Sequence, residues 1–141
     1  MYLLDTDHLT FHQRGEGRDY ETLVGRIALV REQDIHVSVV TFHEQMLGWH
    51  NYLAKDHEPA RLVQGYDRFD RLIGAFGYYQ LRSFDVAAAE IYSELRRRRV
   101  RVGAMDLRIA SIAIANGFTL LTRNSVDFER VPDLGFKNWT N

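Results

Sequence analysis

The segment from residue 103 to residue 128 constrains the fold most, because apolar and polar residues follow one another there in distinct blocks. Asp106 stands at the start of an almost uniformly apolar block that runs to Ala115. A helix that is apolar on nearly all sides has to be enclosed by other elements. Gly117 ends this helix, since glycine adopts the left-handed conformation at a helix end without steric cost. Residues 118–122, FTLLT, then predict a short interior strand.

Polar residues follow this strand and also the first apolar run of the chain. The loop 123–127, RNSVD, comes after the interior strand. Asp5 comes directly after residues 2–4, which we interpret as the first and central strand. Asp7 is placed to cap a short helix over residues 8–13. Because ligands bind at the carboxyl ends of the strands in open α/β sheets, these polar residues are candidates for a functional site.

The rest of the chain predicts further helices and strands in alternation. Helices are expected at residues 19–32, 41–53, 59–76 and 86–99, further strands at 35–39 and 81–84, and an edge strand within 131–139. The segment 43–76 is interpreted as a helical hairpin inserted between strands. Because consecutive strands are too far apart for tight hairpins, their order predicts a parallel sheet flanked by helices. A length of 141 residues suits a single domain, 1–141.

Composition narrows the classes of function. The lack of cysteine excludes disulfides and thiolate metal sites. The net charge is −1, so any attraction to nucleic acid has to be local. No apolar run approaches the roughly 20 residues of a membrane span, and the first residues lack the basic region of a signal peptide. We therefore expect a cytoplasmic protein without a membrane partner.

Three acids are expected at the carboxyl edge of the sheet, although two of them have simple structural explanations. Asp106 suits the first turn of a helix, and Glu44 completes a capping box with Thr41. Asp5 is harder to explain, because a carboxylate that ends a buried strand is costly to desolvate without a partner. Right-handed crossovers would gather all three acids, together with the 123–127 loop, at one edge.

Converging carboxylates need a cation or bound protons. Two carboxylates about 4 Å apart repel each other by roughly 4 kcal/mol at an effective dielectric constant of about 20. The chain has no cysteine and no histidine pair at ligand spacing on a helix, so the available donors are hard oxygens. Such donors favour Mg²⁺ or Mn²⁺ over zinc.

Four blocks of the sequence resemble the signature blocks of PIN-domain ribonucleases, and most closely those of VapC-type toxins from toxin–antitoxin pairs. They occur in the family's order and together span the chain: YLLDTD at 2–7, SVVTFHE at 38–44, GAMD at 103–106 and LTRNSVDF at 121–128. The resemblance implies a three-layer α/β/α fold with a mainly parallel sheet. It implies Mg²⁺-dependent cleavage of RNA, such as tRNA or rRNA, by attack of water. It also implies a homodimer and a VapB-type antitoxin that covers the site and docks near the hairpin.

The resemblance assigns roles to individual acids. Asp5 and Asp106 match the family's principal metal ligands. Glu44 matches its third acid, which would orient a water or recruit a second ion. Asn124 falls where many members carry a fourth aspartate, which leaves open whether Asn124 or Asp127 completes the site.

Asp7 is a second departure from the family pattern, which commonly has asparagine there. Its extra charge either strengthens metal binding or only caps a helix. Together with Thr122, Asp7 is a candidate for supporting the metal ligands without touching the ion.

Arginines are the candidates for holding the RNA. Arg98 and Arg99 belong to the densest basic run, which leads into the segment of Asp106. The alternative is a solvated helix end whose charges suit the helix dipole. Arg123, in the acidic loop, is the better single candidate for contacting the scissile phosphate.

Two other functions fit parts of the sequence. The DTD sequence at 5–7 also resembles the nucleophile loop of haloacid-dehalogenase-type phosphatases, but that chemistry needs a later lysine, and Lys55 and Lys137 are not well placed. A non-catalytic PIN-like module that binds protein or RNA would keep the fold, with Asn124 marking a lost ligand. A metal-dependent assay on structured RNA and on a phosphate monoester separates the three hypotheses.

Overall fold

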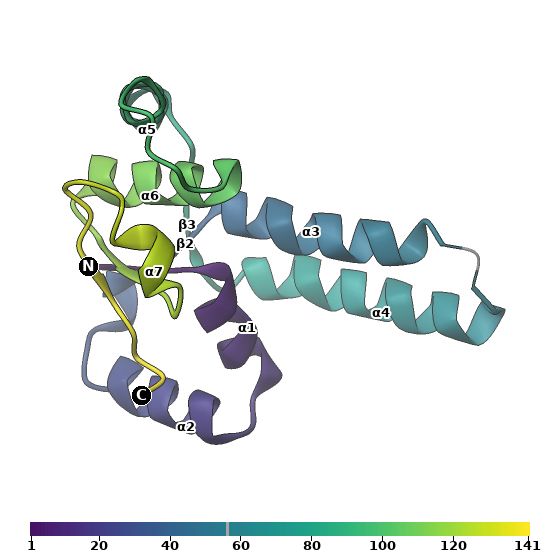
Figure 1. The fold of residues 1–141 in the computed structure, drawn as a ribbon. Coiled ribbons are helices and arrows are strands. Elements are labelled where there is room, and N and C mark those ends of the chain that lie inside the picture. The colour runs from purple at the N-terminus through teal and green to yellow at the C-terminus, as the bar shows by residue number, and fades with distance from the viewer. Residues whose placement is uncertain (56) are drawn as a thin grey trace.

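The computed structural model describes residues 1–55 and 57–141, and within them a parallel sheet occupies the centre of the molecule (Figure 1). Its strands, in spatial order, are β3 (Gln80–Arg82), β2 (Ile35–Ser38), β1 (Tyr2–Leu4), β4 (Thr119–Leu121) and β5 (Phe136–Lys137). Every neighbouring pair is parallel, and Leu4 lies opposite Val37 on one side and Leu121 on the other. The predicted parallel sheet with a central first strand is therefore confirmed.

Helices cover both faces of the sheet and give the molecule three layers (Figure 1). The longer helices are α1 (Thr6–Arg14), α2 (Arg18–Ile27), α3 (Val39–Leu53), α4 (Pro59–Phe76), α5 (Val86–Arg97) and α6 (Ala104–Asn116). Two short ones are α7 (Ser125–Phe128) and a 3-10 helix (Glu32–Asp34). α5 and α6 lie on one face, whereas α1, α2 and the inner end of α4 lie on the other, so the expected α/β/α layering is confirmed.

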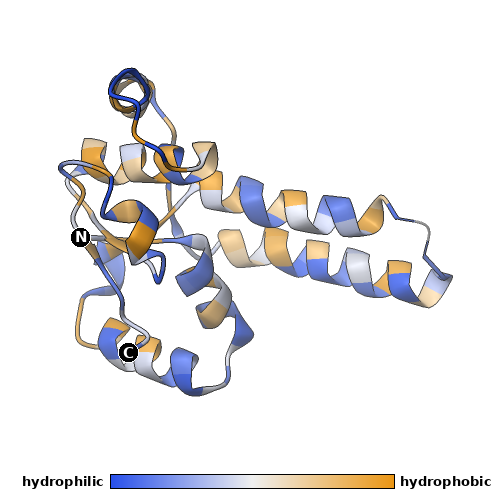
Figure 2. Ribbon diagram, viewed as in Figure 1, coloured by the Kyte–Doolittle hydropathy of each residue, from blue (hydrophilic) through white to orange (hydrophobic). Residues whose placement is uncertain are grey.

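Each face of the sheet has an apolar core, because successive side chains of a strand point to opposite faces. Leu3 packs against α6, in which Ile109 is fully buried. Leu4 faces the other way and packs with Leu9 of α1 and Leu23 of α2. Figure 2 shows α6 mainly in orange and pale colours, in agreement with its predicted position inside the protein.

α3 and α4 form the predicted helical hairpin, which projects from the body of the molecule (Figure 1). Pro59 is the first residue of α4, where its missing N–H costs no hydrogen bond. The two helices approach closely at Gly65, where an added Cβ would lie 2.6 Å from Leu53 Cδ2 and 2.8 Å from Tyr52 Cε1. Asp56, within the predicted hairpin, lies outside the described residues.

The predicted start of the first helix is wrong. α1 begins at Thr6, and its N-cap is Asp5, whose carboxylate accepts the backbone N–H of Thr6. Asp7 therefore lies inside the first helical turn instead of capping it. The cause is that both aspartates of the DTD sequence are good N-caps, and the helix starts immediately after β1.

The predicted capping box of α3 is also wrong. The helix begins at Val39, and its N-cap is Ser38, whose hydroxyl oxygen accepts the backbone N–H of Thr41 at 2.9 Å. Thr41 thus lies within the helix, and Glu44 lies one turn further along. Glu44 is consequently free of the structural role that the sequence pattern suggested.

The remaining differences concern boundaries. α2 ends at Ile27 instead of residue 32, and α5 ends at Arg97 instead of residue 99. The loop after β4 contains the start of α7, which was not predicted. The edge strand expected within 131–139 is present as β5. Among the described residues, no helix combines the length and apolarity that crossing a membrane requires.

Candidate active site

Asp5 lies at the carboxyl edge of the sheet and is only 6% exposed. Its Oδ1 accepts the backbone N–H of Thr6 at 2.8 Å, and its Oδ2 accepts the hydroxyl of Thr122 at 2.7 Å. Burial raises the pKa of Asp5 to about 7, and the nearby charges of Asp7 and Asp106 add to this rise, while the two hydrogen bonds oppose it. The site therefore holds a carboxylate whose ionised form is poorly solvated.

Asp106 lies in the first turn of α6, on the other face of the sheet from α1, and its charge contributes to the raised pKa of Asp5. Partial burial raises the pKa of Asp106 to about 6, and the negative charges of Glu44, Asp127 and Asp7 raise it further. The acids that the sequence pattern placed at one edge of the sheet are thus close enough to repel one another.

Glu44 reaches this edge from α3. Its Oε2 accepts the hydroxyl of Thr6 at 2.8 Å, which ties the side chain to the start of α1. This bond joins α3 to the residue that follows Asp5, so it fixes the position of the third acid relative to the first. Thr6 is a site residue that sequence reasoning missed, although it belongs to the DTD sequence.

Asn124 bridges two acids in the loop after β4. Its amide Nδ2 donates to Asp127 Oδ2 at 3.0 Å and, more weakly, to Asp106 Oδ2 at 3.5 Å. Its backbone N–H donates to the hydroxyl of Thr122 at 3.0 Å. Arg130, not identified from the sequence, lies 3.4 Å from Asp127 Oδ1. The structure therefore brings both Asn124 and Asp127 to Asp106.

Asp7 uses both of its carboxylate oxygens within the protein. Its Oδ1 lies 2.7 Å from Nδ1 of His8, and its Oδ2 accepts the backbone N–H of Arg123 at 2.8 Å. The Asp7 carboxylate thus connects α1 to the loop after β4. The sequence left two roles open for Asp7, stronger metal binding and helix capping. The position of α1 excludes capping, and the hydrogen bond to Arg123 shows that Asp7 holds the loop after β4.

Of the arginines predicted to hold the RNA, one lies at the acidic edge and, within the described part of the chain, two do not contact it. Arg123 lies at the acidic edge, where its guanidinium donates to Asp19 at 3.1 Å and lies 5.2 Å from the ring centroid of Phe11. Arg98 and Arg99 are exposed in the turn after α5, the outer helix that packs on α6 (Figure 1). Arg98 and Arg99 make no contact with the site acids among the described residues.

The acidic edge fits a hard divalent cation in its chemistry. Within residues 1–55 and 57–141, no group of three or more histidine, cysteine, aspartate or glutamate side chains is arranged to hold a metal ion. Mg²⁺, however, usually keeps several waters and binds through one or two carboxylates. Asp5 and Asp106 supply two carboxylates. A bound cation would stabilise their ionised forms and so offset the desolvation and the repulsion that raise both pKa values.

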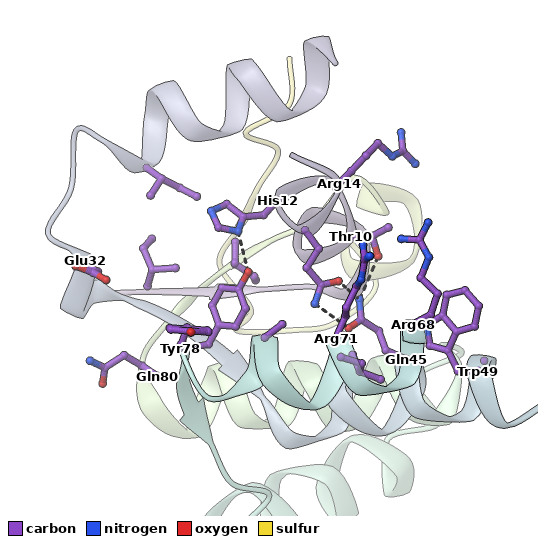
Figure 3. A pocket seen from close by; sticks show the side chains of 18 of the residues that line it. Thr10, His12, Arg14, Glu32, Gln45, Trp49, Arg68, Arg71, Tyr78 and Gln80 are labelled. Carbon is purple, nitrogen blue, oxygen red and sulfur yellow. Dashed lines mark hydrogen bonds between the residues drawn. The ribbon is translucent and has the colours of Figure 1, made fainter. Parts of the chain in front are cut away.

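A separate groove of about 1630 Å³ lies beside the site, between α1 and the hairpin (Figure 3). Two hydrogen bonds join residues that line the groove, one between His12 and Tyr79 at 2.8 Å and one from Gln45 to Gln13 at 2.8 Å. Its lining combines aromatic and aliphatic side chains with four arginines and a single acid: Leu72, Trp49, Tyr52, Tyr79, Arg14, Arg31, Arg68, Arg71 and Glu32. The groove is therefore largely apolar with more arginines than acids in its lining, although Arg31 and Arg71 are paired with Asp34 and Asp67, and the site carboxylates are not part of it.

The parallel sheet and the acids at its carboxyl edge together define a PIN domain, and the chain belongs to the PIN domain family, whose model matches residues 2–134. Its relatives include the tRNA(fMet)-specific endonuclease VapC of Salmonella typhimurium, 30% identical over 107 residues that cover 73% of this chain and 74% of that protein. Ribonuclease VapC2 of Rickettsia felis is 44% identical over 50 residues, 36% of this chain and 37% of that protein. The matches to the Rickettsia relatives span less than half of those proteins.

A solved structure has the same fold over the whole chain. The VapBC-1 complex of nontypeable Haemophilus influenzae contains a chain that matches with a TM-score of 0.75 at 18% identity, over 99% of this chain and 98% of that one. At this identity the likeness shows the fold alone. The resemblance read from the sequence blocks is thereby confirmed at the level of family and fold.

Proposed function

We propose that this protein is the ribonuclease toxin of a toxin–antitoxin pair and that it hydrolyses RNA phosphodiester bonds at the acidic edge with Mg²⁺, for which Mn²⁺ can substitute. The observation that carries the proposal is the pair Asp5 and Asp106, two carboxylates from different layers whose pKa values are raised to about 7 and about 6 by burial and by the negative charges of neighbouring acids. Two of the relatives, a ribonuclease and an endonuclease, support the same class of reaction.

Asp5 and Asp106 would hold the ion. Bound Mg²⁺ supplies Lewis acidity, which activates water for attack and offsets charge on the phosphate. Glu44, fixed by the hydroxyl of Thr6, is suited to accept a hydrogen bond from the attacking water. Asn124 donates to Asp106 and Asp127, which moderates the repulsion between these two acids.

Arginines close to the acids would bind the substrate. The side chain of Arg123 is 49% exposed beside Asn124, so a phosphate can reach its guanidinium, which would share its donors between the phosphate and Asp19. Arg130 offsets the charge of Asp127 at the same loop. Arg98 and Arg99, exposed in the turn after α5, stay a prediction as contacts to the RNA backbone.

The test is a cleavage assay with purified protein on tRNA and on rRNA fragments, with Mg²⁺, with Mn²⁺ and with EDTA. We expect cleavage only with a divalent ion and a loss of at least about a hundredfold in Asp5→Asn and Asp106→Asn, because one metal ligand is removed in each. Asp70→Asn, an exposed acid on α4, is the matched control and should cleave normally. Unchanged cleavage in the first two variants would contradict the proposal.

The same assay, extended to a simple phosphate monoester and to RNA binding, decides between the alternatives. A non-catalytic module would bind RNA without cutting it under any metal condition. A haloacid-dehalogenase-type phosphatase would hydrolyse a simple phosphate monoester, and its second aspartate would have to be free to act as an acid. Asp7 instead accepts hydrogen bonds on both oxygens, which favours the ribonuclease.

We also propose that a VapB-type antitoxin binds in the groove between α1 and the hairpin and that the toxin forms a homodimer in the cytoplasm. Solved structures that resemble this fold include VapBC2 of Rickettsia felis and a toxin–antitoxin complex from Klebsiella pneumoniae. The apolar walls and the four arginines of the groove suit an amphipathic segment with acidic residues. Charge reversal at Arg68 and Arg71 should weaken capture of the co-expressed antitoxin, whereas reversal at Arg96, on α5, should not. Light scattering of the purified toxin tests the dimer.

A further inference from the structure

A chain of hydrogen bonds runs from the C-terminal tail, through the buried ring of His8, to the acidic edge. The backbone N–H of Trp139 donates to Nε2 of His8 at 3.0 Å. Nδ1 of His8 lies 2.7 Å from Asp7 Oδ1, and Asp7 Oδ2 accepts the backbone N–H of Arg123 at 2.8 Å. His8 is 0% exposed, so its bond to Trp139 is shielded from water, whereas Asp7 is 29% exposed and its bond to Arg123 lies at the surface.

The donors and acceptors of this chain fit together in only one way. Because Nε2 of His8 accepts an N–H, its ring proton has to be on Nδ1, which then donates to Asp7. The carboxylate of Asp7 accepts from both His8 and Arg123, which an asparagine with a single acceptor oxygen cannot do. The aspartate at position 7 is thus matched to a histidine at position 8 and to the main chain at Arg123.

We propose that His8 is a positioning residue, which orients Asp7 so that its carboxylate holds the backbone of the loop after β4 in place. That loop carries three side chains of the candidate active site. Thr122 donates to Asp5, Asn124 donates to Asp106, and Arg123 is suited to contact the substrate. The tail residue Trp139 fixes the ring of His8, so the end of the chain contributes to the geometry of the acids.

His8 does not act on the substrate itself. Both of its ring nitrogens are engaged, and the ring is enclosed, with Phe11 packed edge-on at a centroid distance of 6.4 Å. Its effect on cleavage therefore has to pass through Asp7 and Arg123. This role presupposes the proposed ribonuclease activity, but its structural part, the restraint on the Arg123 amide, can be measured without any RNA.

Two substitutions divide the function of the ring. In His8→Asn the side-chain amide nitrogen takes the place of Nδ1 and keeps a donor for Asp7, while the acceptor for Trp139 is lost. In His8→Gln the amide oxygen takes the place of Nε2 and keeps the acceptor, while the donor to Asp7 is lost. Both variants remove a buried ring, so a role in packing alone would affect them alike.

The experiment measures three quantities in both variants: hydrogen exchange of the Arg123 amide, kcat and KM for RNA, and the unfolding midpoint. The loss of one hydrogen bond to a charged group changes an equilibrium constant by about tenfold. We therefore expect the Arg123 amide to exchange about tenfold faster, and kcat to be about tenfold lower, in His8→Gln than in His8→Asn. His50→Gln, an exposed histidine on α3, is the control and should match wild type.

The outcomes separate the two proposals. If wild type does not cleave RNA, the proposed function fails, whereas the exchange rate of Arg123 still tests the role of His8. Equal Arg123 exchange in His8→Asn and His8→Gln would overturn the positioning role. If His8→Gln does not fold, Asp7→Asn takes its place in the experiment. In that variant either His8 or the Arg123 amide loses its acceptor. Unchanged Arg123 exchange and unchanged cleavage in that variant would also overturn it.

Discussion

Replacing Asp5 by asparagine is expected to stabilise the metal-free protein at neutral pH while it abolishes cleavage. Asp5 is 6% exposed, and burial, with help from the charges of Asp7 and Asp106, raises its pKa from 3.8 to about 7. The folded protein therefore binds this proton more tightly than the unfolded chain does. Ionisation of Asp5 then lowers the free energy of unfolding as the pH rises from about 4 to about 7, and the loss is complete above that range.

The size of this effect follows from the pKa. A difference of about 3 pKa units, at about 1.4 kcal/mol each, corresponds to about 4 kcal/mol of destabilisation at pH 8. The asparagine has one acceptor oxygen for the two donors, Thr6 and Thr122, and this loss costs about 1–2 kcal/mol. We expect the free energy of unfolding of Asp5→Asn to be about 2–3 kcal/mol higher than that of wild type at pH 8 and slightly lower at pH 4.

Urea unfolding in EDTA at pH 4, 6 and 8 measures the free energy of unfolding of both proteins. Asp70→Asn, which removes an exposed carboxylate from α4, is the control and should follow wild type at every pH. The difference between Asp5→Asn and wild type should change sign between pH 4 and pH 8. A difference that is the same at all three pH values would refute the reasoning, because it could not arise from ionisation of Asp5.

Three further predictions concern the metal, the hairpin and the RNA. Mg²⁺ at 100 times its dissociation constant should raise the stability of wild type by about 2.7 kcal/mol in thermal unfolding and leave Asp106→Asn unchanged; equal shifts in both would place the ion elsewhere. Gly65→Ala should cost about 1–3 kcal/mol in urea unfolding, because its Cβ would lie 2.6 Å from Leu53 Cδ2, whereas Gly48→Ala, inside α3 with nothing within 4 Å, should stabilise by about 0.5–1 kcal/mol through helix propensity; equal effects would refute close packing of the hairpin. Arg123→Ala should raise KM and reduce the salt dependence of RNA binding by about one phosphate contact; an unchanged salt slope would remove Arg123 from the substrate site.

Much of the fold could be predicted from the sequence because its signals are local and periodic. The all-round apolar pattern of 107–115 and the apolar run 119–121 place α6 and β4 inside the protein whatever their partners are. The helix starts could not be resolved in the same way. Asp5 and Asp7 are both good caps, as are Ser38 and Thr41, and only the point where each strand stops pairing decides between them. α7 has four residues, too few for a helical period to appear.

The acids of the candidate site could be proposed from the sequence, whereas the residues that hold these acids in place could not. Asp5 follows β1 and Asp106 lies in the first turn of α6, so the topology brings these two acids to one edge, whereas the position of Glu44 depends on where α3 begins. The link from Trp139 to His8 spans 131 positions and the link from Asp7 to Arg123 spans 116. No local pattern encodes contacts of this kind, because they depend on how the tail and the loop after β4 pack against α1.

The most direct measurement is the binding of Mn²⁺ to the purified protein, followed by the loss of the free-ion signal in electron paramagnetic resonance. Wild type should take up Mn²⁺ and release it to excess Mg²⁺, and Asp5→Asn and Asp106→Asn should each leave the ion free in solution. Wild type that leaves Mn²⁺ free, or variants that bind it as well as wild type does, would show that the buried carboxylates do not form a cation site.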